Sequence, residues 1–282
     1  MAAEIKTIQF GEVTRIDLSR RIAGRGRYWT TAYLVDGLMI DTGCAHTAAE
    51  LGRALQNEQL SQIVNTHSHE DHIGANATLK SIRDSVGIFA HPAALPILAD
   101  PRTYQPLQAY RRWFWGWPDA STAQPLEQDT VIETDRYSFE VLFTPGHSQD
   151  HICLYEPNQG WLFSGDAFIG GKDRALLAGS DIWKMIDSLK ILAGLPAAIM
   201  FPGCAQVRED PSQELSNKIE YYQEMGEKVL LLHKAGAKVS EIANILFGRP
   251  MLIELFTWGH FSRRRLVLSY LGMNDDGLRN SS

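Results

Sequence analysis

The sequence predicts an α/β fold, because short apolar stretches typical of buried strands alternate with amphipathic stretches typical of helices. Two observations carry this prediction. Asp36-Gly37 separates the apolar runs 32–35 and 38–40, and this dipeptide is a strong signal for a two-residue β-hairpin turn. Residues 181–195 have helical spacing, with an apolar stripe made of Ile182, Met185, Ile186, Leu189 and Leu192.

The elements that follow the hairpin continue the alternation. Thr47 is expected to cap a helix that carries Leu51 and Leu55 on its inner face. Residues 62–66 form a short buried strand that ends at His67, and residues 75–85 and 87–91 are expected to form a helix and a strand.

Residues 93–120 interrupt the pattern with several prolines and are expected to form a helical insertion. This insertion holds an aromatic cluster, namely Tyr110, Trp113, Phe114, Trp115 and Trp117. Its residues could form an apolar lid or simply pack the inserted helices. Strands are expected again at 137–143, 152–155, 161–164 and 197–201, and helices follow Pro211, with Ser240 and Ser262 as caps.

Composition excludes several classes of protein. The chain has 282 residues, of which 44% are hydrophobic and 21% charged, and its net charge of −6 argues against a general nucleic-acid binder. Its three cysteines form no evident disulfide framework, which favours a reducing compartment. No signal peptide is apparent, and the longest apolar stretch, 191–201, is far below the ~20 residues that span a bilayer. We therefore expect a cytoplasmic protein without a membrane partner.

The run His67-Ser68-His69-Glu70-Asp71-His72 is the strongest functional signal in the chain. Three imidazoles and a carboxylate lie within six residues, directly after a predicted strand. Neutral imidazole and carboxylate are ligands for zinc, iron or manganese. A metal site is therefore predicted at the end of this strand, where a rigid scaffold holds ligands at a cleft.

The run resembles the signature of the metallo-beta-lactamase superfamily, and three later segments match that family in order. Residues 144–148 resemble its Pro-Gly-His-Ser/Thr segment, residues 163–166 resemble its Ser/Thr-Gly-Asp segment, and residues 201–204 stand where most relatives have Pro-Gly-His. The resemblance implies a four-layer αββα sandwich over residues 1–210, with a C-terminal helical extension over 211–282 packed on it. It is closest to glyoxalase II-like and lactonase-like metallo-hydrolases.

The resemblance also implies a set of metal ligands. His67, His69 and His147 would hold one metal, Asp71 and His72 would hold another, and Asp166 would bridge the two. Two zinc ions are the expected cofactors, with one iron or a half-occupied site as the alternative. Asp71 would in addition orient the attacking hydroxide and accept its proton, and so act as a catalytic residue.

Cys204 departs from the family pattern, because a histidine usually stands at this position. Three interpretations stay open. Cys204 ligates the second metal as a thiolate, which zinc accepts readily. Alternatively His260 reaches in from the C-terminal extension and completes the ligand shell. Finally, the second site is weak or empty and Cys204 is a buried structural cysteine.

Three further residues have expected roles. His260 is a candidate substrate-binding residue, with a histidine at a helix start as the alternative. The segment Ile40-Asp41-Thr42-Gly43 also resembles a family segment at the base of the site, which implies that Asp41 orients a ligand imidazole through its second ring nitrogen. His151 is expected to form structural hydrogen bonds rather than to bind metal.

The function that follows is a metal-dependent hydrolase in which a metal-bridging hydroxide cleaves a small ester, thioester or lactone. Two alternatives remain. One is a mononuclear-iron sulfur dioxygenase that uses His67, His147 and Asp166; the other is a non-catalytic ligand-binding member of the fold. A small-molecule substrate is the expected partner, and a homodimer through the C-terminal helices is left open.

Overall fold

The N-terminal hairpins build the first sheet of the computed structural model, which describes residues 3–273. Four strands pair antiparallel in chain order: β1 (Ala3–Phe10), β2 (Val13–Ile22), β3 (Arg25–Val35) and β4 (Leu38–Ile40). Three more continue the sheet parallel to β4: β5 (Gln62–Val64), β6 (Gly87–Ala90) and β7 (Gln124–Pro125). The hairpin predicted at Asp36-Gly37 is confirmed, since both residues have the positive φ (48° and 79°) that this tight turn requires.

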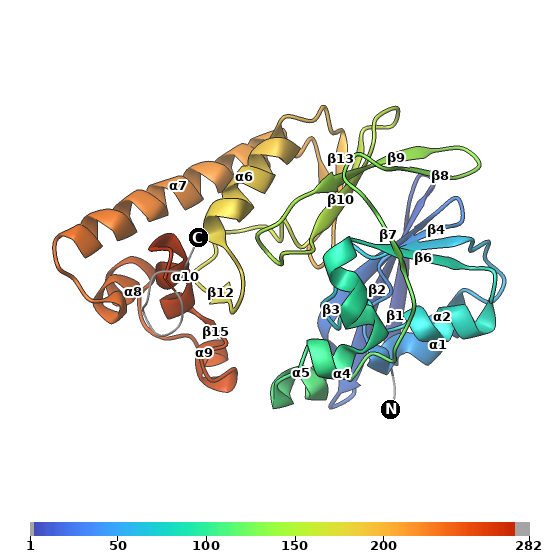
Figure 1. The fold of residues 1–282 in the computed structure, drawn as a ribbon, viewed down its shortest axis with the longest axis horizontal. Coiled ribbons are helices and arrows are strands. Elements are labelled where there is room, and N and C mark those ends of the chain that lie inside the picture. Colours follow the sequence, from blue (N-terminus) through green and yellow to red (C-terminus); the bar gives the residue numbers. More distant parts are fainter. Residues whose placement is uncertain (1–2, 274–282) are drawn as a thin grey trace. The chain divides into compact units, whose positions relative to one another are not determined.

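Two short helices cover one face of this sheet, α1 (Ala48–Ala54) and α2 (Asn76–Ile82) (Figure 1). Their apolar side chains, including Leu51 and Leu79, join residues of the sheet in one buried core. Thr47 is the last residue of the 3₁₀ turn Ala45–Thr47 and directly precedes α1, but the predicted side-chain cap is wrong. Its hydroxyl instead donates to the carbonyl of Cys44 at 2.9 Å.

The insertion between β6 and β7 is helical, as predicted. It contains a 3₁₀ turn (Pro92–Ala94), α3 (Leu95–Ala99), α4 (Pro101–Tyr104) and α5 (Ala109–Phe114). The aromatic side chains of α5 differ in exposure: Tyr110 and Phe114 are buried, whereas Trp113 is 48% exposed.

The second sheet has the strand order β14-β13-β11-β10-β9-β8. Its strands are β8 (Val131–Glu133), β9 (Ser138–Phe143), β10 (Ile152–Glu156), β11 (Trp161–Gly165), β13 (Ile199–Pro202) and β14 (Arg208–Glu209). Side chains from both sheets share a second core, in which Tyr33 of β3 packs edge-on against Phe163 of β11 and Phe201 of β13. The two sheets therefore face each other through an apolar interior.

The remaining helices form a unit of their own. They are α6 (Ile182–Ala193), α7 (Ser212–Lys234), α8 (Val239–Phe247), α9 (Leu252–Phe256) and α10 (Arg263–Tyr270), beside a small pair of strands, β12 (Leu176–Leu177) and β15 (Phe261–Ser262). Ser262 caps α10 as predicted, accepting from the amide of Arg265 at 3.3 Å. Ser240 does not cap α8, because the helix already begins at Val239 and Glu241 accepts from the amide of Lys238.

The described chain thus divides into two compact units. The first consists of residues 3–143, 150–169 and 197–209, and the second of residues 144–149, 170–196 and 210–273. The predicted α/β sandwich with helices at the C-terminus is confirmed. None of the helices in residues 3–273 combines the length and the apolar composition that crossing a bilayer requires.

Candidate metal centre

The His67–His72 run lies in a loop that follows β5, a strand in the parallel part of the first sheet. Two contacts from other loops hold its backbone. The amide of Ser68 donates to the carboxylate of Asp150 at 2.9 Å, and the carbonyl of His72 accepts from the amide of Thr42 at 2.7 Å. The loop is therefore fixed at both ends, so its side chains are presented from a rigid support.

Three of the predicted ligands converge in the first unit. His67, His72 and Asp166 each offer one ligand atom, and these atoms lie within 4.8 Å of one another. Nε2 of His72 lies 3.6 Å from Asp166 and 4.0 Å from Asp71, while the ring nitrogens Nε2 of His67 and Nδ1 of His69 are 3.0 Å apart. Both His67 and His72 are fully buried. Nitrogen and carboxylate donors are thus gathered around one point below the surface.

Asp41 orients His72, as the sequence predicted. The carboxylate of Asp41 lies 2.7 Å from Nδ1 of His72 and accepts from both the amide and the hydroxyl of Thr66, each at 2.7 Å. Its φ of 59° is in the left-handed region, which aspartate tolerates better than most residues. The opposite nitrogen of His72, Nε2, is buried and has no hydrogen-bond partner among residues 3–273.

This arrangement fits a metal ligand. A buried imidazole nitrogen normally has a partner, and here the nitrogen without one points toward two carboxylates. A carboxylate on Nδ1 fixes the tautomer that leaves the lone pair of Nε2 available, which is how metal-binding histidines are usually supported. The donor set of nitrogen and oxygen suits zinc, iron or manganese.

The carboxylates around His72 dominate its electrostatics. Burial alone would lower the pKa of His72, but the negative charges of Asp41, Asp166 and Asp71 outweigh burial and hold that pKa well above its usual value. The pKa of Asp71 is raised, mainly by burial and further by the charge of Asp166, against the opposing effect of His72. A site with this much negative charge favours a bound cation, whether a proton or a metal ion.

Two residues place Asp166 at the end of β11. His151 accepts a hydrogen bond from the amide of Asp166 at 3.1 Å, which is the structural role predicted for it. Gly203 leaves the space that the site needs, because a Cβ there would lie 2.6 Å from Oδ1 of Asp166 and 2.9 Å from Cε1 of His72. The backbone at Gly203 therefore forms one wall of the donor cluster.

His147 and His260 belong to the second unit. The loop that carries His147 is held there by the hydroxyl of Ser180, which donates to the carbonyl of His147 at 2.7 Å, and by the amide of Asp181, which donates to Gly146. The carbonyl of His260 accepts from the amide of Ala178 in the small β12–β15 pair. Metal binding by His147 and substrate contact by His260 stay predictions.

The structure contradicts the interpretation of Cys204 as a buried structural cysteine. Its side chain is exposed, so it is not a buried structural cysteine. Gly203 is buried, and the next residue, Cys204, is exposed to solvent. Among the described residues, the clusters able to hold a metal do not include Cys204, and its role as a thiolate ligand stays a prediction.

Sequence reasoning missed one prominent partnership of the motif. Glu70 is fully buried, and both of its carboxylate oxygens accept from Arg111 of α5, one of them at 2.6 Å from Nε. Burial raises the pKa of Glu70 while the charge of Arg111 lowers it, and the pKa of Arg111 itself is raised by Glu70 against the effect of burial. A buried glutamate needs a cation nearby, and the position of Glu70 between predicted ligands was the one signal that could have pointed to an arginine of the insertion.

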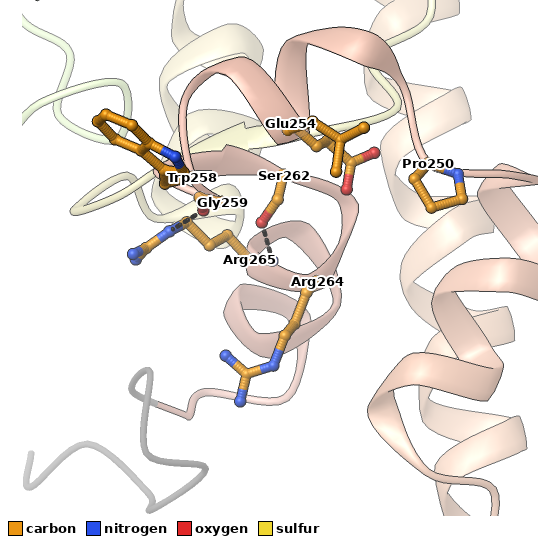
Figure 2. A pocket seen from close by; sticks show the side chains of 8 residues that line it. Pro250, Glu254, Trp258, Gly259, Ser262, Arg264 and Arg265 are labelled. Atoms are coloured by element: carbon orange, nitrogen blue, oxygen red, sulfur yellow. Dashed lines mark hydrogen bonds between the residues drawn. The ribbon is translucent and has the colours of Figure 1, made fainter. Parts of the chain in front are cut away.

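A separate cavity of about 490 Å³ lies in the second unit (Figure 2). It is lined by Pro250, Glu254, Leu255, Trp258, Gly259, Ser262, Arg264 and Arg265. Two of the lining side chains are fixed by hydrogen bonds, since Glu254 accepts from Arg263 at 2.7 Å and Arg265 donates to the carbonyl of Gly259 at 2.8 Å. His260 is not among the lining residues, so this cavity adds nothing to its predicted role.

Comparison with known proteins identifies the family of this chain. A family model described as the metallo-beta-lactamase superfamily matches residues 26–204, which include the donor cluster. Among curated proteins, the chain is 33% identical over 148 residues to a hydroxyacylglutathione hydrolase of Thermosynechococcus vestitus, covering 52% of this chain and 48% of that protein. It is 31% identical over 205 residues to the beta-lactamase-like protein 2 homolog of Drosophila melanogaster, covering 68% and 63%.

Solved structures support the same assignment. A metallo-beta-lactamase family protein from Thermus thermophilus matches with a TM-score of 0.68 over 93% of each chain, and its 20% identity shows a shared fold. A protein solved in a di-iron-bound form matches with a TM-score of 0.54 and 31% identity, over 67% of this chain and 94% of that one. The chain spans 48% and 63% of the lengths of the two curated relatives named above. With the family model matching well over half of its residues, the chain belongs to the metallo-beta-lactamase superfamily.

Proposed function

We propose that this protein is a metal-dependent hydrolase that cleaves a thioester or a related small ester or lactone. The observation that carries the proposal is the convergence of His67, His72 and Asp166, with the buried Nε2 of His72 directed at two carboxylates. Membership of a superfamily that includes hydrolases supports it, as does the resemblance to a hydroxyacylglutathione hydrolase.

The proposed metal ligands are those expected from the motifs. His67, His69 and His147 would hold one ion and Asp71 and His72 a second, with Asp166 between them and Cys204 as a further candidate. A metal held there would lower the pKa of a bound water to about 7 and would polarise a substrate carbonyl. Zinc suits the donor set, and iron is the alternative, since a relative of 31% identity was solved in a di-iron-bound form.

The remaining steps fall to side chains of this protein. Asp41 fixes the ring of His72 through a 2.7 Å hydrogen bond, so the ligand nitrogen does not need to reorient when a metal binds. Asp71 lies beside this nitrogen, and burial raises the pKa of its carboxyl, which favours proton uptake. It is the proposed group that orients the nucleophilic water and accepts its proton.

The proposed substrate class is the thioester of a small hydroxyacid. Thioester hydrolysis needs no nucleophilic side chain when a metal centre supplies the attacking water, so the proposed metal ligands would suffice for the bond-breaking chemistry. The curated relative of 33% identity carries the name of an enzyme that acts on a glutathione thioester of this kind. Lactones and oxygen esters present a similar carbonyl and are the next substrates to compare.

The test is a hydrolysis assay on the zinc-loaded full chain with a hydroxyacyl-glutathione thioester, a lactone and a phosphodiester. We expect turnover of the thioester or the lactone and a loss of at least about a hundredfold in Asp166→Ala. Asp84→Ala is the control, because that side chain is fully exposed. Equal activity in Asp166→Ala and the wild type would refute the proposed centre.

The same protein preparation distinguishes the alternative activities. An iron-loaded chain that consumes oxygen in the presence of a persulfide, and hydrolyses none of the three compounds, would replace the hydrolase with a sulfur dioxygenase. Binding of a thioester without turnover in a metal-loaded chain would indicate a non-catalytic ligand-binding protein.

A further inference from the structure

The strongest feature outside the donor cluster is the buried ion pair between Glu70 and Arg111. Glu70 is 0% exposed and Arg111 8% exposed. Nε of Arg111 donates to Oε1 of Glu70 at 2.6 Å, and Nη2 donates to Oε2. This two-pronged contact uses the planar guanidinium as a fork, which fixes orientation as well as distance.

The pair joins two segments that chain order keeps apart. Glu70 stands in the metal motif, between His69 and Asp71, and Arg111 stands 41 residues later on α5 of the insertion. The motif at this point is a turn outside regular secondary structure, closed by a 2.9 Å hydrogen bond from the amide of His72 to the carbonyl of His69. Anchoring the side chain of Glu70 therefore restrains the backbone on which the two neighbouring ligand candidates stand.

Other contacts join α5 and the residues just after it to the rest of the first unit. The amide of His46 donates to the carbonyl of Trp115 at 3.2 Å, and Arg20 donates to the carbonyl of Trp113. The ring of Phe114 packs at a tilt against that of Tyr28, with ring centroids 3.8 Å apart and an interplanar angle of 53°. These contacts lie at the C-terminal end of the helix, whereas Arg111 contacts the motif itself through Glu70.

A buried pair of this type makes each partner depend on the other. Removal of either side chain leaves an uncompensated charge in the interior, whereas replacement of both by apolar residues of similar volume removes that charge. An apolar contact would hold α5 in place without fixing the orientation of the two side chains relative to each other. The fork between Arg111 and Glu70 adds directional control over the turn that carries Asp71.

We propose that Glu70 and Arg111 are positioning residues that couple metal loading of the motif to the order of α5. The inference rests on the proposed metal centre. Binding of a metal by residues on either side of Glu70 restricts the turn, and this restriction reaches residues 109–114 through the ion pair. Coupling of this kind is reciprocal, so a change on α5 that breaks the pair also weakens metal binding.

Hydrogen–deuterium exchange of the full chain, with and without zinc, tests this coupling. In the wild type we expect zinc to slow exchange of the α5 amides by about tenfold, an effect that a chelator reverses. In Arg111→Met the α5 amides should exchange at the same rate with and without zinc. The zinc dissociation constant of that variant should rise by about 10–100-fold.

Three further variants separate positioning from folding. Arg112→Met is the matched control on the same helix, because Arg112 is exposed, and it should behave as the wild type. Arg111→Lys keeps the charge but loses the fork and should restore only part of the zinc affinity. The double variant Glu70→Leu/Arg111→Met should regain the melting temperature lost in Arg111→Met without regaining the response of α5 to zinc.

Two results would overturn the coupling. One is Arg111→Met, or the double variant if the single one does not fold, with wild-type zinc affinity and a zinc response in α5. The other is a wild-type chain that binds zinc while exchange in α5 stays unchanged. A chain that binds no metal at all would instead refute the proposed function, so the two failures are distinguishable.

Discussion

Replacement of Asp41 by asparagine should disable His72 as a metal ligand while leaving the shape of the site almost intact. Oδ1 of Asp41 accepts from the amide of Thr66, and Oδ2 accepts from the hydroxyl of Thr66 and lies 2.7 Å from Nδ1 of His72. An asparagine side chain has only one oxygen, which the amide of Thr66 requires, so its NH₂ group faces Nδ1 of His72. The imidazole is then driven to the tautomer in which Nε2 carries the proton, and that nitrogen no longer donates a lone pair.

The expected magnitude follows from the role of this contact. Loss of a carboxylate that supports a ligand histidine typically costs 10–100-fold in metal affinity or activity, which corresponds to about 1.4–2.8 kcal/mol. The unfolding free energy of the metal-free protein should fall by about 1–3 kcal/mol, because a buried charged acceptor of three hydrogen bonds is lost. Asparagine tolerates the positive φ of 59° at this position, so backbone strain adds little.

Competition with a chromophoric chelator measures the zinc dissociation constant of Asp41→Asn. The matched control is Asp36→Asn, since Asp36 also has a positive φ (48°) on the first sheet but lies in the β3–β4 turn, where it binds Arg136. The control should bind zinc as the wild type does. An Asp41→Asn variant with wild-type zinc affinity would refute the role assigned to this carboxylate.

Two further predictions concern Cys204 and pH. At pH 8 iodoacetamide should modify the exposed Cys204 first, because Cys44 and Cys153 are buried and burial raises the pKa of Cys44 to about 11; mass spectrometry locates the label. If Cys204 is a ligand, zinc should slow its modification by about tenfold or more, and an unchanged rate would exclude that role. In the metal-free protein the pKa of His72 is raised above its usual value of 6.5, so the stabilising proton is fully present below pH 6.5 and is lost as the pH rises through the raised pKa. The melting temperature of the metal-free chain should therefore fall toward alkaline pH more steeply than that of His72→Gln, and equal slopes would contradict the electrostatics described here.

Local signals in the sequence were sufficient for much of the fold. Asp36-Gly37 predicted its hairpin because only a few residue types accept the two positive φ angles of that turn. The side-chain caps proposed at Thr47 and Ser240 failed for different reasons: the Thr47 hydroxyl donates to the carbonyl of Cys44 instead, and α8 already begins at Val239, before Ser240. Propensity alone places helix ends only approximately.

The donor cluster was predictable to the extent that its ligands stand in ordered motifs. The support of His72 by Asp41 was predicted from the resemblance of residues 40–43 to a segment of the superfamily. The ion pair between Glu70 and Arg111 could not be derived, because no periodicity relates a loop residue to a helix 41 positions later. The exposure of Cys204 could not be derived from the sequence pattern either, since it depends on the path of the chain after β13 and Gly203.

Elemental analysis of the purified full chain after loading with zinc, and separately with iron, tests the metal centre most directly. We expect about two ions per chain in the wild type, and a loss of at least one of them in Asp166→Ala, with the circular dichroism spectrum unchanged. A wild-type chain that retains less than about one tenth of an ion under both conditions would contradict a metal centre built from His67, His72 and Asp166.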